Sequence, residues 1–266
     1  MAQSADAPKI RLFVEGALAA DGSIVLPAEQ SHYATNVMRL AVGDHVAVFN
    51  GRDGEWDAEI ASVGRRRCDL RIERPLRTQF FGPDLWLVFA PVKRAKIDFL
   101  AAKATELGVS ALWPVLTERT EARRVNLGRL RANAVEAAEQ CGRVDVPDVL
   151  PVAELNRILS EWPIERRLLV CDPTATARPV AEVLSDRDDT DHHPWAILTG
   201  PEGGFTRSEL DGLDKLPFVS RAGLGPRTLR AETAGLAALA CWQALLGDWR
   251  DGGRLSVDPP GTADLA

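Results

Sequence analysis

The chain reads Leu198-Thr-Gly-Pro-Glu-Gly-Gly-Phe205 and, further along, Leu224-Gly-Pro-Arg-Thr-Leu-Arg-Ala-Glu-Thr-Ala234. Each segment follows a short apolar run and precedes a helical pattern, which predicts two strand-to-helix turns that form the walls of one ligand pocket. The glycine spacing matches neither the G-x-G-x-x-G of a dinucleotide fold nor the Gly-Lys-Ser/Thr of a phosphate-binding loop. We therefore expect a ligand held by backbone groups, which need not be a phosphate.

The composition is that of a soluble protein with one large or two ordinary domains. The chain has 266 residues, of which 45% are hydrophobic and 26% are charged. No apolar run approaches the roughly 20 residues that cross a bilayer, and residues 1–8 lack the core of a signal peptide. The four cysteines form no Cys-x-x-Cys pair, which indicates free thiols in a reducing compartment. We therefore expect a cytoplasmic protein with no membrane contact.

Positive charge is concentrated in three clusters, although the net charge is -6. Residues 1–150 are neutral, with 20 Lys and Arg against 20 Asp and Glu, so the excess of acid lies in 151–266. The clusters lie at 65–77, 93–96 and 119–131. A solvated face would explain any one of them, but arginine pairs bidentately with phosphate, so three clusters together favour contact with RNA.

The first part of the chain, residues 1–76, has the pattern of a small β-barrel that presents a binding surface. A one-sided helix is expected at 28–40, and Asn50-Gly51 predicts a hairpin. Pro, Gly and Thr interrupt both periodicities at 75–83, which marks a boundary. The strands are expected at 10–14, 23–26, 45–49, 56–63 and 67–72.

The second part, residues 77–250, alternates strands with helices, which predicts a largely parallel sheet with helices on both faces. Residues 251–266 have the pattern of a disordered tail. Strands are expected at 85–90, 111–116, 168–171, 195–198 and 218–220, and helices at 97–107, 127–140, 206–213 and 229–246.

Charged residues beside the glycine turns are the candidates for chemistry. Glu202 lies between Pro201 and two glycines, where no helix cap is needed, so a ligand or a structural hydrogen bond is favoured. Arg227 and Arg230 precede a helix whose N-terminal dipole disfavours cations, and such a departure from local preference often marks a working site. Glu232 suits that dipole and could also hold one of the arginines.

Two further patterns do not indicate a functional site. Thr206-Arg-Ser-Glu209 predicts a capping box at the start of a helix. His192-His193 lies in an acidic loop at 185–193, but adjacent histidines in such a loop rarely bind metal. We therefore expect no metal site, and His32 and His45 have no partner within motif reach.

At these residues the chain resembles the bacterial ribosomal RNA small subunit methyltransferase E family, the 16S rRNA (uracil-N3)-methyltransferases of the SPOUT class. The two glycine turns match the paired signatures of the family, and the likeness covers roughly residues 10–247. Glu139-Gln-Cys-Gly-Arg143 usually reads Glu-Gln-Ser-x-Arg, so Cys141 is a near-isosteric departure. Further matches are Arg11-Leu-Phe-Val14, His32-x-x-x-x-Val37-Met-Arg39 and Lys103-Ala-Thr-Glu-Leu-Gly108.

The resemblance implies a PUA-like N-terminal barrel, a parallel α/β domain with a C-terminal trefoil knot, and a homodimer. It implies methylation of N3 of one uridine of 16S rRNA in the small ribosomal subunit, giving m3U1498. The methyl donor would be S-adenosylmethionine bound in the knot. Carried onto this chain, the cofactor would contact Leu198, Thr199, Gly200, Glu202, Gly203, Gly204, Leu224, Gly225, Thr228, Leu229 and Arg230.

Methylation at uracil N3 requires the N3 proton to leave and the resulting imide charge to be held. Arg230 or Arg227 is the candidate stabiliser of that charge, and Glu202 or Glu232 could orient the arginine or accept the proton. N3 lies on the Watson–Crick edge, so the target must be unpaired or splayed out. Candidate RNA contacts are Arg11, Arg39, Arg65, Arg66, Arg67, Lys93, Arg94, Arg123 and Arg124.

Two other functions stay open. A ribose 2′-O-methyltransferase of the SpoU branch shares a similar glycine loop, but has Asn-Val-Ser where this chain has Leu229-Arg-Ala-Glu-Thr233. A non-catalytic RNA-binding or ribosome assembly factor could keep the fold without turnover, although the intact glycines and Arg230 speak against such decay.

Overall fold

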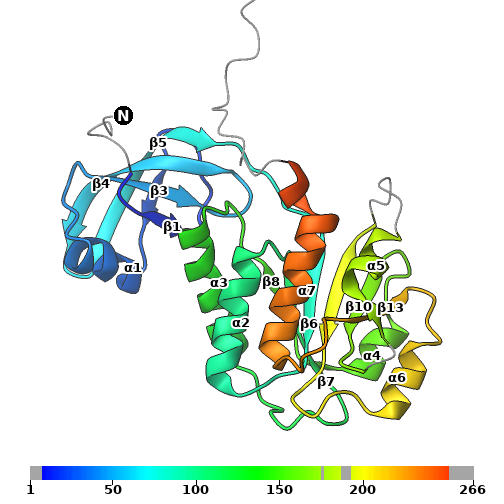
Figure 1. Ribbon diagram of the computed structural model, residues 1–266. Coiled ribbons are helices and arrows are strands. Elements are labelled where there is room, and N and C mark those ends of the chain that lie inside the picture. Colours follow the sequence, from blue (N-terminus) through cyan, green and yellow to red (C-terminus); the bar gives the residue numbers. More distant parts are fainter. Residues whose placement is uncertain (1–7, 175–176, 187–192, 252–266) are drawn as a thin grey trace, which may run out of the picture. The chain divides into compact units, whose positions relative to one another are not determined.

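The structure is a computed structural model that describes residues 8–174, 177–186 and 193–251 (Figure 1). Of the tail predicted at 251–266, residues 252–266 lie outside the described residues, as do His192 and most of the acidic loop, whereas Asp251 ends a short helix. The chain forms two compact units. Among the described residues, the first unit contains the chain up to Phe81 together with Ala138–Val146, and the second contains Gly82–Ala137 and the chain from Pro147 onward.

The first unit is built on a five-stranded sheet in the order β1-β3-β4-β5-β2. The pair β1 and β3 is parallel, and the other neighbours are antiparallel. Alternate residues such as Val46, Val48 and Ile60 point into one apolar core. The strands are β1 (Arg11–Phe13), β2 (Ser23–Val25), β3 (His45–Phe49), β4 (Glu55–Gly64) and β5 (Arg67–Arg77).

All five strands predicted for the barrel are confirmed, as is the hairpin after Phe49, which pairs with Glu55 across a loop begun by Asn50. The predicted helix at 28–40 is shorter and changes type. It comprises α1 (Ala28–His32) and a turn of π-helix, η1 (Tyr33–Val37), after which Arg39 adopts a positive φ of 56°.

The second unit contains a parallel sheet with the strand order β11-β13-β10-β12-β6-β7-β8, and β9 also pairs with β7. Every pairing in it is parallel, which confirms the prediction. The strands are β6 (Leu85–Phe89), β7 (Ala111–Leu116), β8 (Asp148–Val149), β9 (Ala153–Glu154), β10 (Arg167–Cys171), β11 (Arg178–Pro179), β12 (Trp195–Thr199) and β13 (Val219–Gly223).

Helices cover both faces of this sheet. On one face, α4 and α6 bury Leu155, Ile158 and Leu213 against strand residues such as Val88 and Leu198. On the other, α7 packs against β12 and α2. The helices are α2 (Arg94–Glu106), α3 (Leu127–Cys141), α4 (Leu155–Ser160), α5 (Val180–Ser185), α6 (Arg207–Leu213), α7 (Ala231–Leu245) and the short 3₁₀ helix η2 (Asp248–Asp251). No helix of the described chain is long and apolar enough to cross a membrane.

The close packing of α7 depends on Gly235, where an added Cβ would lie 3.3 Å from Cγ2 of Thr199 and 3.5 Å from Cδ1 of Leu87. The small residues of α7 thus bring this helix onto the sheet of its own chain. As a result, the N-terminus of α7 lies beside the end of β12.

The topology gathers three strand ends at one edge of the sheet. β10 lies between β12 and β13, with Val170 opposite Leu198 and Cys171 opposite Ala222. Since all three strands are parallel, their carboxyl ends meet, and ligands of open α/β sheets bind at such an edge. The two glycine turns leave from β12 and β13, on either side of β10.

Candidate active site

A cavity of about 400 Å³ opens at this edge, and both glycine turns line it. Cavities of this size accept small ligands and cofactors. Of the eleven residues expected to contact a cofactor, only Leu198 is absent from the wall, because its side chain is fully buried in the core. The wall comprises Cys171, Asp172, Pro173, Thr199, Gly200, Pro201, Glu202, Gly203, Gly204, Phe205, Leu224, Gly225, Arg227, Thr228, Leu229, Arg230, Ala231 and Ala234.

Two of the glycines have positive φ, 66° at Gly204 and 97° at Gly225. L-residues rarely adopt such a backbone, whereas glycine does so at no steric cost. An added Cβ at either position would meet no atom within 4 Å, so open space lies beside both turns. The cavity is therefore bounded here by bare backbone, as expected for a ligand held by main-chain groups.

Two residues that follow β7, Glu118 and Arg119, form hydrogen bonds to the first glycine turn and to the helix after it. Arg119 Nη1 donates to the carbonyl oxygen of Gly203 at 2.8 Å and to that of Phe205 at 3.3 Å. The buried Glu209 accepts from the backbone N–H of Glu118 at 2.8 Å and from that of Thr206 at 2.7 Å. The predicted capping box is confirmed, and it also ties α6 to the neighbouring loop.

One wall residue of the cavity, Asp172, belongs to an ion pair with Arg221 that the sequence did not reveal. Asp172 follows β10 and accepts from Thr174 and from Arg221, whose Nε lies 2.8 Å away. Burial raises the pKa of the Asp172 carboxyl, but hydrogen bonds from Thr174 and Arg221 outweigh this, so its pKa lies below its usual value. Burial also raises the pKa of the neighbouring Cys171 to about 12, so this thiol is not a nucleophile at neutral pH.

The mouth of the cavity carries both predicted arginines. Arg227 and Arg230 line the wall, and their side chains are exposed. Within the described residues, neither forms an ion pair with Glu202 or Glu232. The predicted pairing of an acid with an arginine is therefore not found. Instead Lys96 lies between the two acids, 3.4 Å from Glu202 and 3.6 Å from Glu232.

The residues expected to contact RNA differ in whether their side chains already pair with an acid. Arg67 pairs with Asp69 at 2.8 Å, and Arg123 lies 4.0 Å from Glu154. The side chain of Arg94 is outside the described part of the structure. Five exposed side chains have no ion-pair or hydrogen-bond partner among the described groups, those of Arg39, Arg65, Arg66, Lys93 and Arg124.

Arg11 has a structural role within the first unit. Its Nε lies 2.5 Å from Glu55, and its other nitrogens donate to the backbone oxygens of Ala138, Glu139 and Arg143. All three guanidinium nitrogens are thereby used inside the protein. Four of its five N–H donors are thus occupied within the first unit, and contact between Arg11 and RNA stays a prediction.

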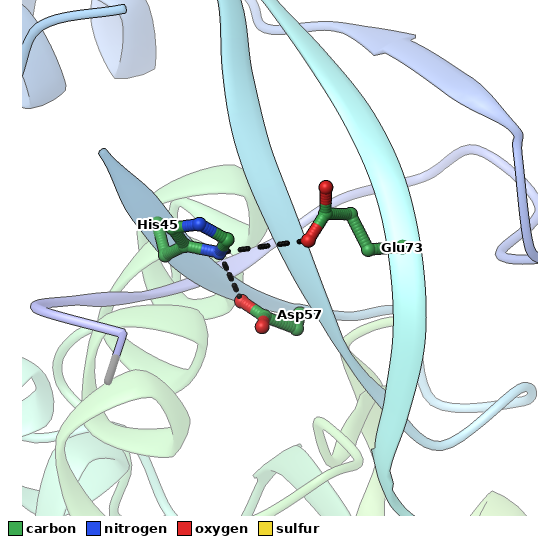
Figure 2. A group of neighbouring side chains, drawn as sticks. All are labelled: His45, Asp57 and Glu73. Atoms are coloured by element: carbon green, nitrogen blue, oxygen red, sulfur yellow. Dashed lines mark hydrogen bonds and ion pairs between the residues drawn. The ribbon is translucent and has the colours of Figure 1, made fainter. Parts of the chain in front are cut away.

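The first unit also contains a cluster of potential metal ligands that the sequence did not predict. Figure 2 shows His45 joined by dashed lines to both Asp57 and Glu73. One ligand atom of each residue lies within 4.8 Å of those of the other two. His45 Nδ1 lies 3.0 Å from Asp57 and 3.8 Å from Glu73. Arg74 and Arg71 already neutralise these carboxylates, each at 3.2 Å. The cluster is thus an ion-pair network of the sheet. The register of the hairpin, which places His45 and Asp57 on one face, was the signal that could have revealed it.

Comparison with known proteins assigns both units. Residues 82–243 match the family model of an RNA methyltransferase domain, and residues 26–73 match that of an RNA methyltransferase PUA domain. A relative from Rickettsia conorii, ribosomal RNA small subunit methyltransferase E, is 30% identical over 231 residues, which cover 86% of this chain and 93% of the relative. The protein of the same name from Bacillus subtilis is 28% identical, over 81% of this chain and 87% of its own.

Solved structures agree with the sequence matches. A crystal structure of ribosomal RNA small subunit methyltransferase E from Neisseria gonorrhoeae, bound to S-adenosyl methionine, superposes with a TM-score of 0.81 at 28% identity. It covers 90% of this chain and 99% of its own. A putative methyltransferase from Legionella pneumophila, also in complex with this cofactor, has the same TM-score and covers 91% of this chain and all of its own.

Proposed function

The chain belongs to the ribosomal RNA small subunit methyltransferase E family, of the SPOUT class, and from this premise we propose that it methylates N3 of one uridine of 16S rRNA. The methyl donor would be S-adenosylmethionine. The observation that carries the proposal is the cavity at the carboxyl edge of the parallel sheet, with both family signatures in its wall.

The residues of the cavity fit such a cofactor. Bare backbone at Gly204 and Gly225 leaves open space where side chains would otherwise project, and Leu224 and Leu229 in the wall offer apolar contacts. We assign cofactor contact to the ten predicted residues of the wall, with Leu198 supporting them from the core. When bound, S-adenosylmethionine supplies a methyl group on a positive sulfonium, which becomes a neutral thioether on transfer.

The protein would contribute position and charge to the reaction. Loss of the N3 proton leaves a negative imide, and a fixed cation beside it lowers the energy of the transition state. Arg230 and Arg227 are the cations of the wall, and we propose that they stabilise this charge. Glu202, which also lines the cavity, would orient the uracil of the substrate. The target uridine would enter unpaired, since N3 lies on its Watson–Crick edge.

RNA would be held by the exposed cations, Arg39, Arg65, Arg66, Lys93 and Arg124, with Arg67, Arg94 and Arg123 as further contacts. The trefoil knot formed by the two glycine turns, the homodimer and the cytoplasmic location are implied by the family and stay predictions.

Methyl incorporation into small ribosomal subunits from a strain that lacks this gene tests the activity. We expect one methyl group per subunit, on the base of a single uridine of 16S rRNA. Mass spectrometry of the digested RNA separates base-methylated from ribose-methylated uridine. A methyl group on the ribose would overturn the proposal in favour of a 2′-O-methyltransferase, and no incorporation despite cofactor binding would indicate a non-catalytic factor.

The role of Arg230 has its own test. Replacing Arg230 with alanine removes a charge that we place beside the developing imide, so kcat should fall by about 10²–10³-fold. Arg207→Ala, an exposed residue outside the cavity on α6, is the matched control and should leave kcat unchanged. Full kcat in the Arg230 variant, with undiminished cofactor affinity by calorimetry, would remove this residue from the mechanism.

A further inference from the structure

One arginine outside the cavity binds two carbonyl oxygens of the first glycine turn. Arg119 Nη1 donates to the carbonyl oxygen of Gly203 at 2.8 Å and to that of Phe205 at 3.3 Å. Both acceptors belong to residues of the cavity wall, whereas Arg119 itself does not line the cavity. Its contact with a bound ligand is therefore indirect, through the backbone that it holds.

The loop that carries Arg119 is itself fixed by buried groups. Thr117 and Thr120 are buried, and Oγ1 of Thr120 lies 2.9 Å from both the backbone nitrogen and Oγ1 of Thr117. The backbone N–H of Glu118 donates to the buried carboxylate of Glu209 at 2.8 Å. Because its neighbours on both sides are held in this way, the backbone of Arg119 is fixed, and its side chain can hold the glycine turn in one place.

The first glycine turn contains Gly203 and Gly204, and adjacent glycines give a backbone more freedom than other residues would. At its start, the ring of Phe205 lies against Gly200, where an added Cβ would be 3.1 Å from the ring. Gly204, between the two carbonyl groups that Arg119 binds, has a φ of 66°. A loop that has to be ordered when its ligand arrives binds that ligand more weakly than an ordered one. Hydrogen bonds from Arg119 would supply this order beforehand.

Two other roles of Arg119 predict different behaviour. As a member of the basic cluster at 119–131, it could bind RNA, but its removal would then leave cofactor binding unchanged when RNA is absent. A purely electrostatic effect would have the opposite sign. A positive charge disfavours the cationic S-adenosylmethionine, so removal of that charge would strengthen cofactor binding.

We propose that Arg119 is a positioning residue that keeps the first glycine turn in the conformation that binds the cofactor. The inference rests on the proposed function. It assigns Arg119 to the affinity for the cofactor and leaves the transfer of the methyl group to the residues of the cavity wall. The turn is then ordered before the cofactor arrives, so less backbone freedom is lost on binding.

Calorimetry without RNA tests the proposal, with S-adenosylmethionine and with S-adenosylhomocysteine, which lacks the methyl group and the positive sulfonium. Arg119→Met should weaken the binding of both by about tenfold, because the turn loses a hydrogen-bond donor that is charged. Arg207→Met, exposed on α6 and 4.0 Å from Asp211, is the matched control and should bind both as the wild type does. Unchanged affinities in Arg119→Met, or tighter binding of S-adenosylmethionine alone, would overturn the proposal.

Steady-state kinetics separates positioning from catalysis. In Arg119→Met the KM for the cofactor should rise by about tenfold, whereas kcat at saturating cofactor should stay within about twofold of the wild type. Arg119→Lys keeps a charged donor and should have a KM below that of Arg119→Met. A lower kcat with an unchanged KM in Arg119→Met would place this residue in the transfer step and overturn the proposal.

A measurement without cofactor or turnover separates this inference from the proposed function. The N–H of Gly204 donates to the carbonyl oxygen of Pro201 at 2.9 Å, so hydrogen exchange at Gly204 reports the order of the turn. Exchange at Gly204 should be faster in Arg119→Met than in the wild type. Exchange at Asp214, whose N–H donates to Leu210 at the end of α6, should be unchanged.

Equal exchange at Gly204 in the two proteins would overturn the role of Arg119 even if the wild type methylates uracil N3. Faster exchange in Arg119→Met, together with a wild type that binds the cofactor but does not methylate uracil N3, would refute the proposed function and leave the role of Arg119 intact.

Discussion

Single glycines shape the cavity because they permit backbone that other residues resist. Gly225 has a φ of 97° and Gly204 a φ of 66°, and both bound the same space. At such angles the Cβ of an L-residue clashes with its own backbone, so the strain arises even where the surroundings are empty. The open space beside Gly225 therefore does not make it replaceable.

Gly225→Ala should destabilise the protein by about 1–3 kcal/mol, because the new Cβ must adopt a sparsely populated backbone region. Urea unfolding measures this loss, and calorimetry should show weaker cofactor binding as the turn relaxes. Gly212→Ala is the matched control, since Gly212 lies in α6 without a positive φ and with nothing within 4 Å. It should be neutral or stabilising by up to about 1 kcal/mol. Equal unfolding free energies for the two variants would contradict the strain argument.

Among the elements, α6 fixes the first glycine turn through one buried side chain. Glu209 accepts from the backbone of Thr206 and of Glu118, so it caps its own helix and holds the loop after β7. Glu209→Ala should cost about 2 kcal/mol, the sum expected for a lost cap and an unsatisfied N–H. Thermal or urea unfolding measures this cost. Asp211→Ala on the same helix, exposed and 4.0 Å from Arg207, should stay within about 0.5 kcal/mol of the wild type. A loss for Glu209→Ala no larger than that of Asp211→Ala would show that Glu209 is only an ordinary cap.

The elements also show what the sequence could and could not predict. Strands such as Ala111–Leu116 and the turn before α6 follow from local patterns, because an apolar run and a capping box lie within a few residues. The helices α4 and α5 have six residues each, too few for a helical period to be recognised. Arg119 and Lys96 were seen only as members of basic clusters, because their partners are 84 and 106 residues away and are brought close by the sheet.

At the scale of the whole molecule, positive charge is distributed over both units while the net charge is -6. Arg65 and Arg66 form the turn between β4 and β5 in the first unit, and Lys93 and Arg124 lie in the second. An RNA bound by such cations releases counterions, so the affinity falls as salt rises. Arginines that already pair with an acid, such as Arg67, contribute less because they must first break that pair.

The double variant Arg65→Gln/Arg66→Gln should therefore bind RNA more weakly and with a smaller dependence on salt. Each lost phosphate contact with single-stranded RNA should reduce the slope of log affinity against log salt by about 0.7. Fluorescence anisotropy with a labelled fragment of 16S rRNA, between roughly 50 and 200 mM salt, measures this slope. Arg157→Gln is the matched control, because Arg157 is exposed on α4, 3.6 Å from Glu161. A slope unchanged in the double variant would remove the β4–β5 turn from the RNA-binding surface. Equal reductions in the double variant and the control would mean that overall charge, rather than this turn, determines binding.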